Sequence, residues 1–247
     1  TEVNVLSGRY KKKPLDRLEK LREALPLKVI GGGSHGKFMY LILEDGSSIH
    51  ITLGMTGGWL DKKLKHARIQ LRFGEKSVYY NDTRNFGTFK LCSSRSALVE
   101  KLKSLGPDIM QKIPDDVFIK ALRKKAHWNI CKAMMDQKVV SGIGNYLKSE
   151  ILYDCQIDPH LHVADLSDEQ LVMIRDSAYR IAWASYESGG ATIQSYRNPD
   201  GTTGEFSRRF AVYACDKDPL GNLVEKIKLD DGRTTHWVPA IQAANAV

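Results

Sequence analysis

Two glycines separated by one residue stand directly before a helix-like run in the middle of the chain. Gly142 and Gly144 lead into Asn145, which suits the N-cap of the apolar-periodic run that follows. Unpaired N–H groups and the positive end of the helix dipole converge at such a start, so its natural ligand is an anion, most readily a phosphate. Lys138 and Lys148 flank the turn. An ordinary corner between helices with structural glycines explains the pattern equally well.

The overall composition favours a polyanionic partner. The 247 residues carry a formal net charge of +8 and a pI near 9.2, although many basic proteins bind no nucleic acid. The hydrophobic fraction of 42% and the charged fraction of 27% argue against disorder and against a membrane protein. Apolar runs stay short of the ~20 residues that a membrane span needs, and the N-terminus has no basic-then-apolar leader. We therefore expect an intracellular protein, in the cytoplasm or the nucleus. We also expect it to act as a monomer.

The cysteines predict neither disulfides nor a metal site. Cys92, Cys131, Cys155 and Cys215 are widely scattered and form no C-x-x-C pair. Such spacing is typical of reduced thiols inside a cell. We expect no metal and no cofactor.

Hydrophobic periodicity divides the chain into a β-rich part and a helical part. The first part begins with a strand at 1–6 and a helix that Pro14 opens and that runs to Leu25. Further short strands are expected at 38–43, 48–53, 67–73, 77–80 and 86–91. Short strands joined by polar loops favour an antiparallel sandwich or barrel.

The spacing becomes helical near Ser94. Helices are expected at 94–105, 115–125, 145–155 and 167–187. The last of them is the best marked, because Ser167 and Gln170 form a capping box at its start. After it comes a polar stretch too long for a simple connection, and loops of that length are usually functional or mobile. The chain closes with a strand at 210–214, a turn at 218–222 and two strands ending near Trp237.

Seven short motifs occur in one order along nearly the whole chain. They are L-G-M-T-G (53–57), N-D-T-R-N-F-G (81–87), L-G-P-D (105–108), M-D-Q-K-V-V-S-G-I-G-N-Y (135–146), D-P-H (158–160), G-G-A-T (189–192) and R-T-T-H-W (233–237). In this order they resemble the formamidopyrimidine-DNA glycosylase and endonuclease VIII family of base-excision repair enzymes.

The resemblance implies an α+β protein that binds damaged double-stranded DNA in a cleft. Residues 1–104 would form an N-terminal antiparallel β-sandwich, and residues 105–209 a helical domain with a helix-two-turn-helix and a lid-like loop. Residues 210–247 would form a C-terminal β-hairpin finger. The change of periodicity near Ser94 agrees with this division.

Three residues resemble those that fill the gap left by an extruded nucleotide. Turning a damaged nucleotide out of the duplex costs roughly a few kcal/mol, and the hole must then be occupied. A flexible apolar side chain, a planar cation that pairs with the widowed base and an aromatic wedge can do this. By resemblance these are Met55, Arg84 and Phe86. The competing interpretation makes Met55 and Phe86 ordinary core residues, but both lie in glycine-bearing or arginine-bearing loops.

Two further residues resemble DNA contacts of the family. Lys37, in the loop G-G-G-S-H-G-K, resembles a lysine that touches the phosphate beside the lesion and assists proton transfer in strand cleavage. His66 resembles a DNA-contacting histidine. Solvated surface is the alternative for both. At another phosphate-binding lysine position the chain has Ala126, so that role is not carried over, although Lys124 or Lys125 can substitute.

The C-terminal hairpin resembles the zincless-finger branch of the family. The four positions that carry cysteine in the zinc-bearing branch read Leu220, Leu223, Val238 and Ile241. Apolar side chains cannot ligate zinc, but they can pack together and hold the hairpin by burial. Arg233 resembles the finger arginine that contacts the lesion phosphates and promotes the second elimination, although by composition alone it is an ordinary turn arginine.

The printed sequence departs from the family at its start. The family nucleophile is an N-terminal proline, whose α-amine attacks the sugar C1′, and the glutamate after it acts as general acid. Thr1 aligns instead with a strand inside the family sequence, and Glu2 lies in the wrong element for that glutamate. We therefore expect the intact protein to be a bifunctional DNA glycosylase and AP lyase acting on oxidised bases by β,δ-elimination. These 247 residues by themselves should bind damaged DNA without cutting it.

Two other classes and the lesion preference stay open. A noncatalytic damage-binding protein would keep the wedge and start without Pro-Glu, whereas an RNA- or ribosome-associated helical protein would not need the three wedge residues together. Residues 190–206 could cover an extruded base, with Tyr196 or Phe206 stacking on it, as in the oxidised-purine branch. The zincless finger points instead to oxidised pyrimidines and hydantoins.

Overall fold

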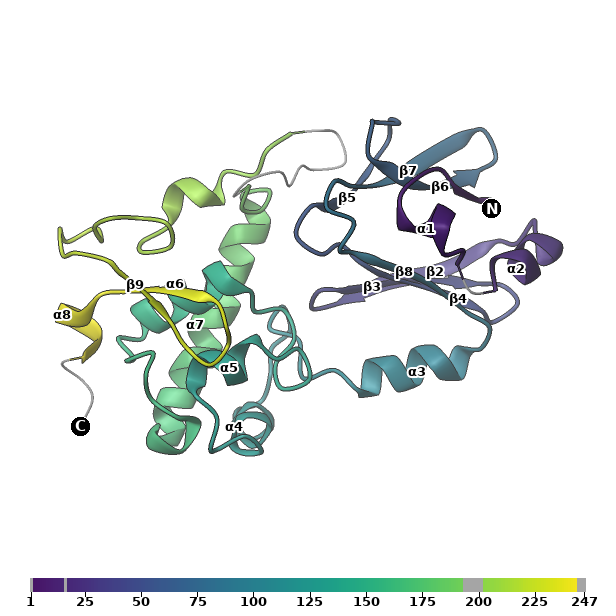
Figure 1. The fold of residues 1–247 in the computed structure, drawn as a ribbon. Helices are drawn as coiled ribbons and strands as arrows, with labels where there is room; N and C mark the ends of the chain where they lie inside the picture. Colours follow the sequence, from purple (N-terminus) through teal and green to yellow (C-terminus); the bar gives the residue numbers. More distant parts are fainter. Residues whose placement is uncertain (1, 16, 193–201, 244–247) are drawn as a thin grey trace. The chain divides into compact units, whose positions relative to one another are not determined.

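The computed structural model describes residues 2–15, 17–192 and 202–243, and the chain divides into two compact units (Figure 1). The first unit comprises Thr1–Lys103 and Gly189–Glu205. The second comprises Ser104–Ser188 and Phe206–Val247.

The first unit contains two antiparallel sheets, which Figure 1 shows as two layers. Its strands are β1 (Glu2–Val5), β2 (Val29–His35), β3 (Phe38–Leu43), β4 (Ser48–Thr52), β5 (Gly57–Leu60), β6 (Ala67–Phe73), β7 (Lys76–Asp82) and β8 (Thr88–Cys92). One four-stranded sheet has the order β1-β6-β7-β5 and the other the order β2-β3-β4-β8. The predicted antiparallel β-sandwich is confirmed.

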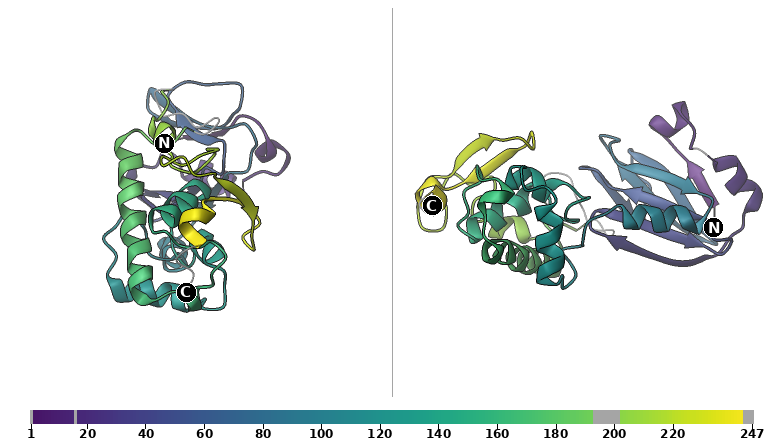
Figure 2. Two further views of the ribbon diagram at one scale, coloured as in Figure 1. Left: turned by 90° about the vertical axis from the view of Figure 1, so that its left-hand side faces the viewer. Right: turned by 90° about the horizontal axis from the view of Figure 1, so that it is seen from below.

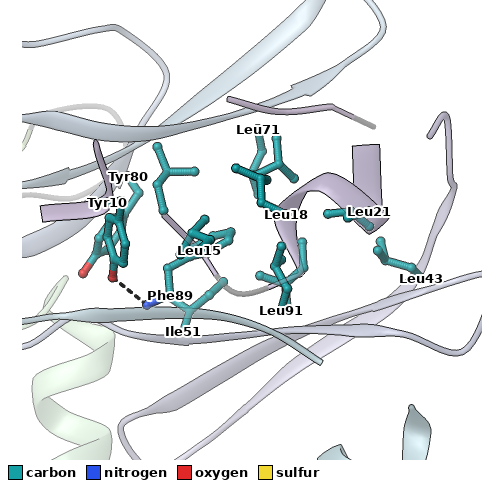
Figure 3. Close-up of a cluster of buried hydrophobic side chains, with 13 residues drawn as sticks. Tyr10, Leu15, Leu18, Leu21, Leu43, Ile51, Leu71, Tyr80, Phe89 and Leu91 are labelled. Carbon is teal, nitrogen blue, oxygen red and sulfur yellow. Dashed lines mark hydrogen bonds between the residues drawn. The ribbon is translucent and has the colours of Figure 1, made fainter. Parts of the chain in front are cut away.

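Alternating apolar residues of the two sheets form the core between the layers. On β4 and β8, Ile49 pairs with Leu91 and Ile51 with Phe89, and all four side chains are buried. Leucines from the segment after β1 point between the layers and close the core (Figure 3). Because fully burying one such side chain stabilises the fold by about 1.5–3 kcal/mol, this shared interior holds the two sheets together.

The helix expected from Pro14 to Leu25 is wrong at its start. The structure has two short helices instead, α1 (Arg9–Lys12) and α2 (Leu18–Ala24). Lys13 is extended, as a residue before proline prefers, and Arg17 has a left-handed φ of 64°. These two backbone conformations end one helix and delay the next. The third helix of this unit, α3 (Arg95–Lys103), falls where helical spacing predicted it.

The glycine-rich run at 31–33 belongs to a strand, whereas the sequence suggested a loop. A Cβ on Gly33 would lie 2.7 Å from the Tyr40 hydroxyl, so the absence of a side chain lets β2 pass close to β3. Lys37 consequently lies in the two-residue turn of a β-hairpin, at 36–37, and its side chain is exposed.

The second unit is helical with a C-terminal hairpin. Its helices are α4 (Asp115–Arg123), α5 (Ile130–Met135), α6 (Asn145–Asp154), α7 (Asp168–Glu187) and α8 (Pro239–Gln242), with short 3₁₀ turns at Val163–Asp165 and Phe206–Arg209. The hairpin pairs β9 (Glu225–Lys228) with β10 (Thr234–Trp237). Figure 2 shows α7 as the long green helix and the hairpin in yellow.

The capping box of α7 is confirmed. The Ser167 amide donates to Gln170 Oε1 at 2.8 Å, and the Gln170 amide donates to Ser167 Oγ at 3.2 Å. Helix α5, by contrast, was not predicted. Among the described residues, no helix is both long and apolar enough to cross a membrane.

The expected strand at 210–214 is wrong, because a carboxylate takes its backbone donors. Glu150 on α6 accepts hydrogen bonds from the amides of Ala211, Val212 and Tyr213 at 2.8, 3.0 and 2.7 Å. These N–H groups therefore donate to one side chain and not to the carbonyl groups of a neighbouring strand. The segment instead forms bends and turns that are fixed to α6.

Phe206 does not present a free face for stacking on a base. Its side chain is 6% exposed and packs against the rings of Tyr146 and Phe210, with centroids at 6.2 and 5.9 Å. The Phe206 ring is therefore already covered by other side chains of its own unit. The other stacking candidate, Tyr196, lies outside the described residues.

Candidate nucleic-acid interface

The structure brings the three predicted wedge residues together on the first unit. Arg84 Nη1 lies 3.6 Å from Met55 Sδ, and the Arg84 guanidinium lies 4.7 Å from the centroid of the Phe86 ring. Met55 is 55% exposed and Phe86 58% exposed. The alternative that these two residues belong to the core is therefore wrong. We call Met55, Arg84 and Phe86 the wedge cluster.

A buried carboxylate, Asp82, joins the two loops that carry the wedge cluster. Thr56 Oγ1 donates to Asp82 Oδ1 at 2.5 Å and accepts from the Arg84 amide at 3.0 Å. The Gly87 amide donates to Asp82 Oδ2 at 2.9 Å. Both loops are thus attached to one completely buried side chain at the end of β7. Sequence reasoning missed this role, although Asp82 stands inside the motif N-D-T-R-N-F-G.

Glycine is required where the two loops touch. Gly54 has a φ of 62°, and a Cβ there would lie 2.8 Å from the Gly87 nitrogen. A Cβ on Gly87 would lie 1.7 Å from the Tyr80 hydroxyl. No side chain fits between the loops, so their backbones hold Met55 and Phe86 close to each other.

Arginines brace the same loops from behind. Arg68 donates to the backbone carbonyls of Asp82 at 2.7 Å and Thr83 at 3.1 Å, and Arg9 donates to the carbonyl of Gly87. Three backbone carbonyls beside the wedge cluster thereby receive a charged donor. Such bonds are stronger than neutral ones, and they fix the loop conformation before any ligand arrives.

The other two predicted contacts of the first unit lie in different places. The carbonyl of half-buried His66 accepts from the Asp82 amide at 3.1 Å, so His66 is attached to the scaffold of the wedge cluster. Lys37 belongs to the other sheet, in the turn between β2 and β3. An exposed lysine at a hairpin turn can reach an external phosphate.

The glycine turn of the second unit has a backbone conformation that requires glycine. Gly142 has a φ of 108°, and a Cβ there would lie 2.6 Å from Ile109 Cγ1. Gln137 braces the turn, since its side chain accepts from the Gly142 amide at 3.0 Å and donates to the carbonyl of Ile143 at 3.1 Å. The turn is therefore held in one shape by its own side chains.

Asn145 is the first residue of α6 and not its N-cap. Gly144 takes the cap position with an extended backbone, and the first helical bond runs from the Lys148 amide to the Gly144 carbonyl at 2.8 Å. The amides of residues 145–147 precede that bond, so they have no acceptor within the helix. The Asn145 side chain instead donates to the carbonyl of Thr234 at 2.9 Å.

The two lysines that flank the turn differ in their exposure to solvent. Lys148 is completely buried and forms an ion pair with Asp231, so its charge does not face the solvent beside the turn. Lys138 is exposed. Further along the same unit, Lys125 and Lys132 place their ammonium groups 4.6 and 4.7 Å from the ring of Trp128. Lys125 is one of the two residues that the sequence suggested as a replacement for the family lysine at position 126.

Two of the four apolar residues expected to hold the finger by burial do not do so, while Ile241 is half-buried. Leu220 is 76% exposed and Leu223 71% exposed, whereas Val238 is buried. The turn is held by Asp218, which accepts from the amides of Leu220 and Asn222 at 3.0 and 2.8 Å. Tyr153 on α6 also donates to Asp218 at 3.0 Å, and burial together with this bond raises the pKa of Tyr153 to about 12. Hydrogen bonds to Asp218 hold this turn, whereas the sequence suggested that packing of apolar side chains would hold it.

Arg233 lies exposed in the turn between β9 and β10. Its amide donates to Asp231 Oδ1 at 3.0 Å. Further along β10, burial and the charges of Lys226 and Lys148 lower the pKa of His236, which keeps that imidazole neutral near pH 7. The exposed cation of this hairpin turn is thus the guanidinium of Arg233.

The four cysteines are free thiols in the structure. Burial raises the pKa of Cys131 and of Cys155 to about 12, so both stay protonated and unreactive near neutral pH. Within the part of the chain that the structure describes, no three His, Cys, Asp or Glu side chains are grouped so that they could hold a metal ion.

The sheets, the helical unit and the hairpin together define the fold of helix-two-turn-helix DNA glycosylases. Three domain models of formamidopyrimidine-DNA glycosylase match the chain: the N-terminal domain at residues 1–89, the H2TH domain at 105–197 and the C-terminal domain at 200–243. The chain belongs to the formamidopyrimidine-DNA glycosylase family.

Individual relatives support this assignment. The formamidopyrimidine-DNA glycosylase of Mycoplasma mobile is 33% identical over 221 residues, which are 86% of this chain and 80% of the relative. That of Prochlorococcus marinus is 33% identical over 188 residues, 72% of this chain and 63% of the relative. The crystal structure of MutM (Fpg) from Thermus thermophilus matches with a TM-score of 0.84 and 26% identity, over 98% of this chain and 90% of that chain. Lactococcus lactis Fpg in complex with abasic-site DNA matches with a TM-score of 0.82 and 25% identity, over 98% and 91%.

Proposed function

We propose that this chain recognises damaged duplex DNA, as a monomer, for base excision and AP-lyase cleavage at oxidised bases. The observation that carries the proposal is the wedge cluster. An exposed methionine, an exposed phenylalanine and an arginine within contact of both are held by loops whose glycines leave no room for other side chains.

The wedge cluster has the chemistry that an emptied base position demands. Met55 supplies a flexible apolar side chain, Phe86 an aromatic wedge, and Arg84 a planar fork of donors for the widowed base. Buried Asp82 holds both loops before DNA arrives. Little conformational entropy is then lost when the cluster enters the duplex, which favours binding.

The second unit supplies phosphate contacts. The first-turn amides of α6 and the exposed guanidinium of Arg233 are suited to anions, and Lys37 of the first unit adds a further cation. Contacts of this kind position a duplex but do not read its sequence. The Lactococcus lactis relative has been crystallised with Fapy-dG DNA and with abasic-site DNA, which agrees with a ligand of this class.

Cleavage requires more than binding. In the proposed reaction an amine attacks the sugar C1′ and a carboxylic acid protonates the departing base or the sugar, while Lys37 and Arg233 assist the eliminations. A polypeptide of these 247 residues begins with Thr1-Glu2 and not with Pro-Glu. We expect that polypeptide to bind a lesion duplex without forming a Schiff base.

The decisive experiment compares a duplex containing a tetrahydrofuran abasic analogue with the same duplex undamaged. Fluorescence anisotropy should show tighter binding to the damaged duplex, and the preference should fall in M55A and F86A. M173A and F73A are matched controls, since Met173 is 50% exposed and Phe73 37% exposed outside the wedge cluster. Equal affinity for both duplexes, or equal loss in the controls, would refute the proposal.

Two further measurements distinguish a DNA glycosylase from a noncatalytic damage-binding protein and from an RNA-binding protein. Borohydride should trap no adduct with the 247-residue polypeptide, and it should trap one after a Pro-Glu segment of the family is added at the N-terminus. Absence of trapping in both, with lesion binding retained, would favour a noncatalytic damage-binding protein. Competition with structured RNA that outperforms the lesion duplex would favour an RNA-binding protein.

A further inference from the structure

A buried ion pair links α6 to the turn of the finger. The Lys148 ammonium donates to Asp231 Oδ2, and the two side chains are 0% and 2% exposed. Removing two charges from water is costly, and a pair of apolar residues often stabilises a fold equally well. The pair therefore calls for an explanation beyond stability.

Asp231 uses its second oxygen on the backbone that carries Arg233. Asp231 Oδ1 accepts from the Arg233 amide at 3.0 Å, while Oδ2 accepts from Lys148. The carboxylate thus connects a lysine in the middle of α6 to the residue that presents the exposed guanidinium. Gly232, with a φ of 68°, lies between them and gives the turn no side chain of its own for support.

A second bond from the same helix fixes the other side of Arg233. The Asn145 side chain, at the first position of α6, donates to the carbonyl of Thr234 at 2.9 Å. Asn145 and Lys148 are three residues apart, so they lie on one face of the helix. The backbone on both sides of Arg233 is therefore attached to the helix whose first turn offers its amides to an anion.

The leucines of the turn at 218–223 do not supply this attachment. Leu220 and Leu223 are exposed, and the other ion pair of the hairpin, Lys226 with Asp216, is long at 3.5 Å and half to fully solvated. Lys148 cannot touch DNA itself, because no part of its side chain reaches solvent. Any effect of Lys148 on DNA must act through Asp231 and the hairpin turn.

We propose that Lys148 is a positioning residue, which through Asp231 holds Arg233 beside the first turn of α6 so that both contact the same stretch of lesion phosphates. This inference rests on the proposed function, in which Arg233 contacts the DNA backbone. In this inference the buried pair of Lys148 and Asp231 determines the position of Arg233.

A double-mutant cycle on the full chain tests the coupling. Binding of the tetrahydrofuran duplex is measured for wild type, R233A, K148M and R233A/K148M. We expect R233A to weaken binding roughly tenfold or more, K148M to weaken it in the same range, and K148M to change it less than about twofold when Arg233 is already absent. K148R should retain most of the affinity, and K226M, which removes the exposed pair of the same hairpin, should match wild type.

Salt dependence gives a readout that general destabilisation would not move. Losing one phosphate contact lowers the slope of log K against log salt by about 0.9. R233A should show this decrease, and K148M should show it too although Lys148 is buried. Additive losses in the cycle, or a K148M slope equal to that of wild type, would overturn the inference.

Hydrogen exchange of the free protein tests the attachment without DNA. The Arg233 amide should exchange faster in K148M and in the milder variant D231N, whose side-chain oxygen can still accept from Arg233 but which leaves Lys148 without its counter-charge. Unchanged exchange in folded variants would overturn the inference. If R233A binds as wild type does, the role of Arg233 in the proposed function fails, and the exchange rates alone decide whether Lys148 fixes the turn.

Discussion

Replacing Asp82 with alanine should both destabilise the first unit and separate the loops of the wedge cluster. The buried carboxylate accepts from the Thr56 hydroxyl at 2.5 Å and from the Gly87 amide at 2.9 Å. Alanine leaves both donors without this acceptor. An unsatisfied buried polar group costs about 1–3 kcal/mol, so the pair costs roughly 2–6 kcal/mol of unfolding free energy.

A loss of this size is easily measured. About 1 kcal/mol shifts the Tm of a domain of ~100 residues by roughly 4–8 °C, so thermal unfolding followed by circular dichroism should show D82A melting at least ~8 °C below wild type. At temperatures where D82A is folded, its preference for the tetrahydrofuran duplex should fall as far as that of M55A. D82N retains an acceptor and should lie between D82A and wild type.

The matched control is D61A, which removes an exposed carboxylate of the same unit. It should change the Tm by less than about 2 °C, as surface substitutions usually do. The assignment of Asp82 as the residue that joins the two loops would be refuted if D82A had the same Tm as D61A, or if D82A kept the full preference for the damaged duplex.

Three other outcomes follow from single residues. G142A should lower stability by about 1–3 kcal/mol in denaturant titration, because its φ of 108° and the nearby Ile109 side chain exclude a Cβ; full stability would contradict this. The folded state lowers the pKa of His236 below its ordinary 6.5, so the unfolded state binds the proton more readily. The contribution of neutral His236 to the free energy of unfolding should therefore be fully present above pH 6.5 and should be lost as the pH falls through the lowered pKa of the folded state. In H236Q the Tm should decrease less over this pH range. Iodoacetamide at pH 8 should label Cys215 before Cys131, because the Cys131 thiol is fully buried and has a pKa of about 12. Mass spectrometry of the folded protein measures the order of labelling, and labelling of Cys131 first would contradict this prediction.

The chemistry of the wedge cluster could be anticipated only in part. The motifs around Met55, Arg84 and Phe86 suggested which side chains fill an emptied base position, and their loops suggested exposure. Asp82 was missed because a single aspartate at a strand end has many uses in proteins. Its role depends on Thr56 and Gly87 meeting around it, and that meeting is set by the pairing of β5 with β7.

Local patterns determined most of the element order. Local apolar and β-branched patterns predicted six of the strands of the first unit, and the capping box at Ser167 placed the start of α7, because each signal acts within a few residues. The same local rules failed at Arg17, whose left-handed backbone lies between the buried residues Leu15 and Leu18. They failed again at 31–33, where a glycine run pairs as a strand beneath Tyr40.

The sequence by itself determined the family, the order of the two units and the residue types available for DNA binding. Only the tertiary structure decided which charges face solvent. Lys148 and Asp231 are 83 residues apart, and nothing near either residue shows that they neutralise each other in the interior. Leu220 and Leu223 are apolar residues that are exposed to solvent, while Lys148, which follows the glycine turn at 142–144, is buried. Burial depends on which distant segments meet, and the free energy of that meeting is a property of the whole packed unit.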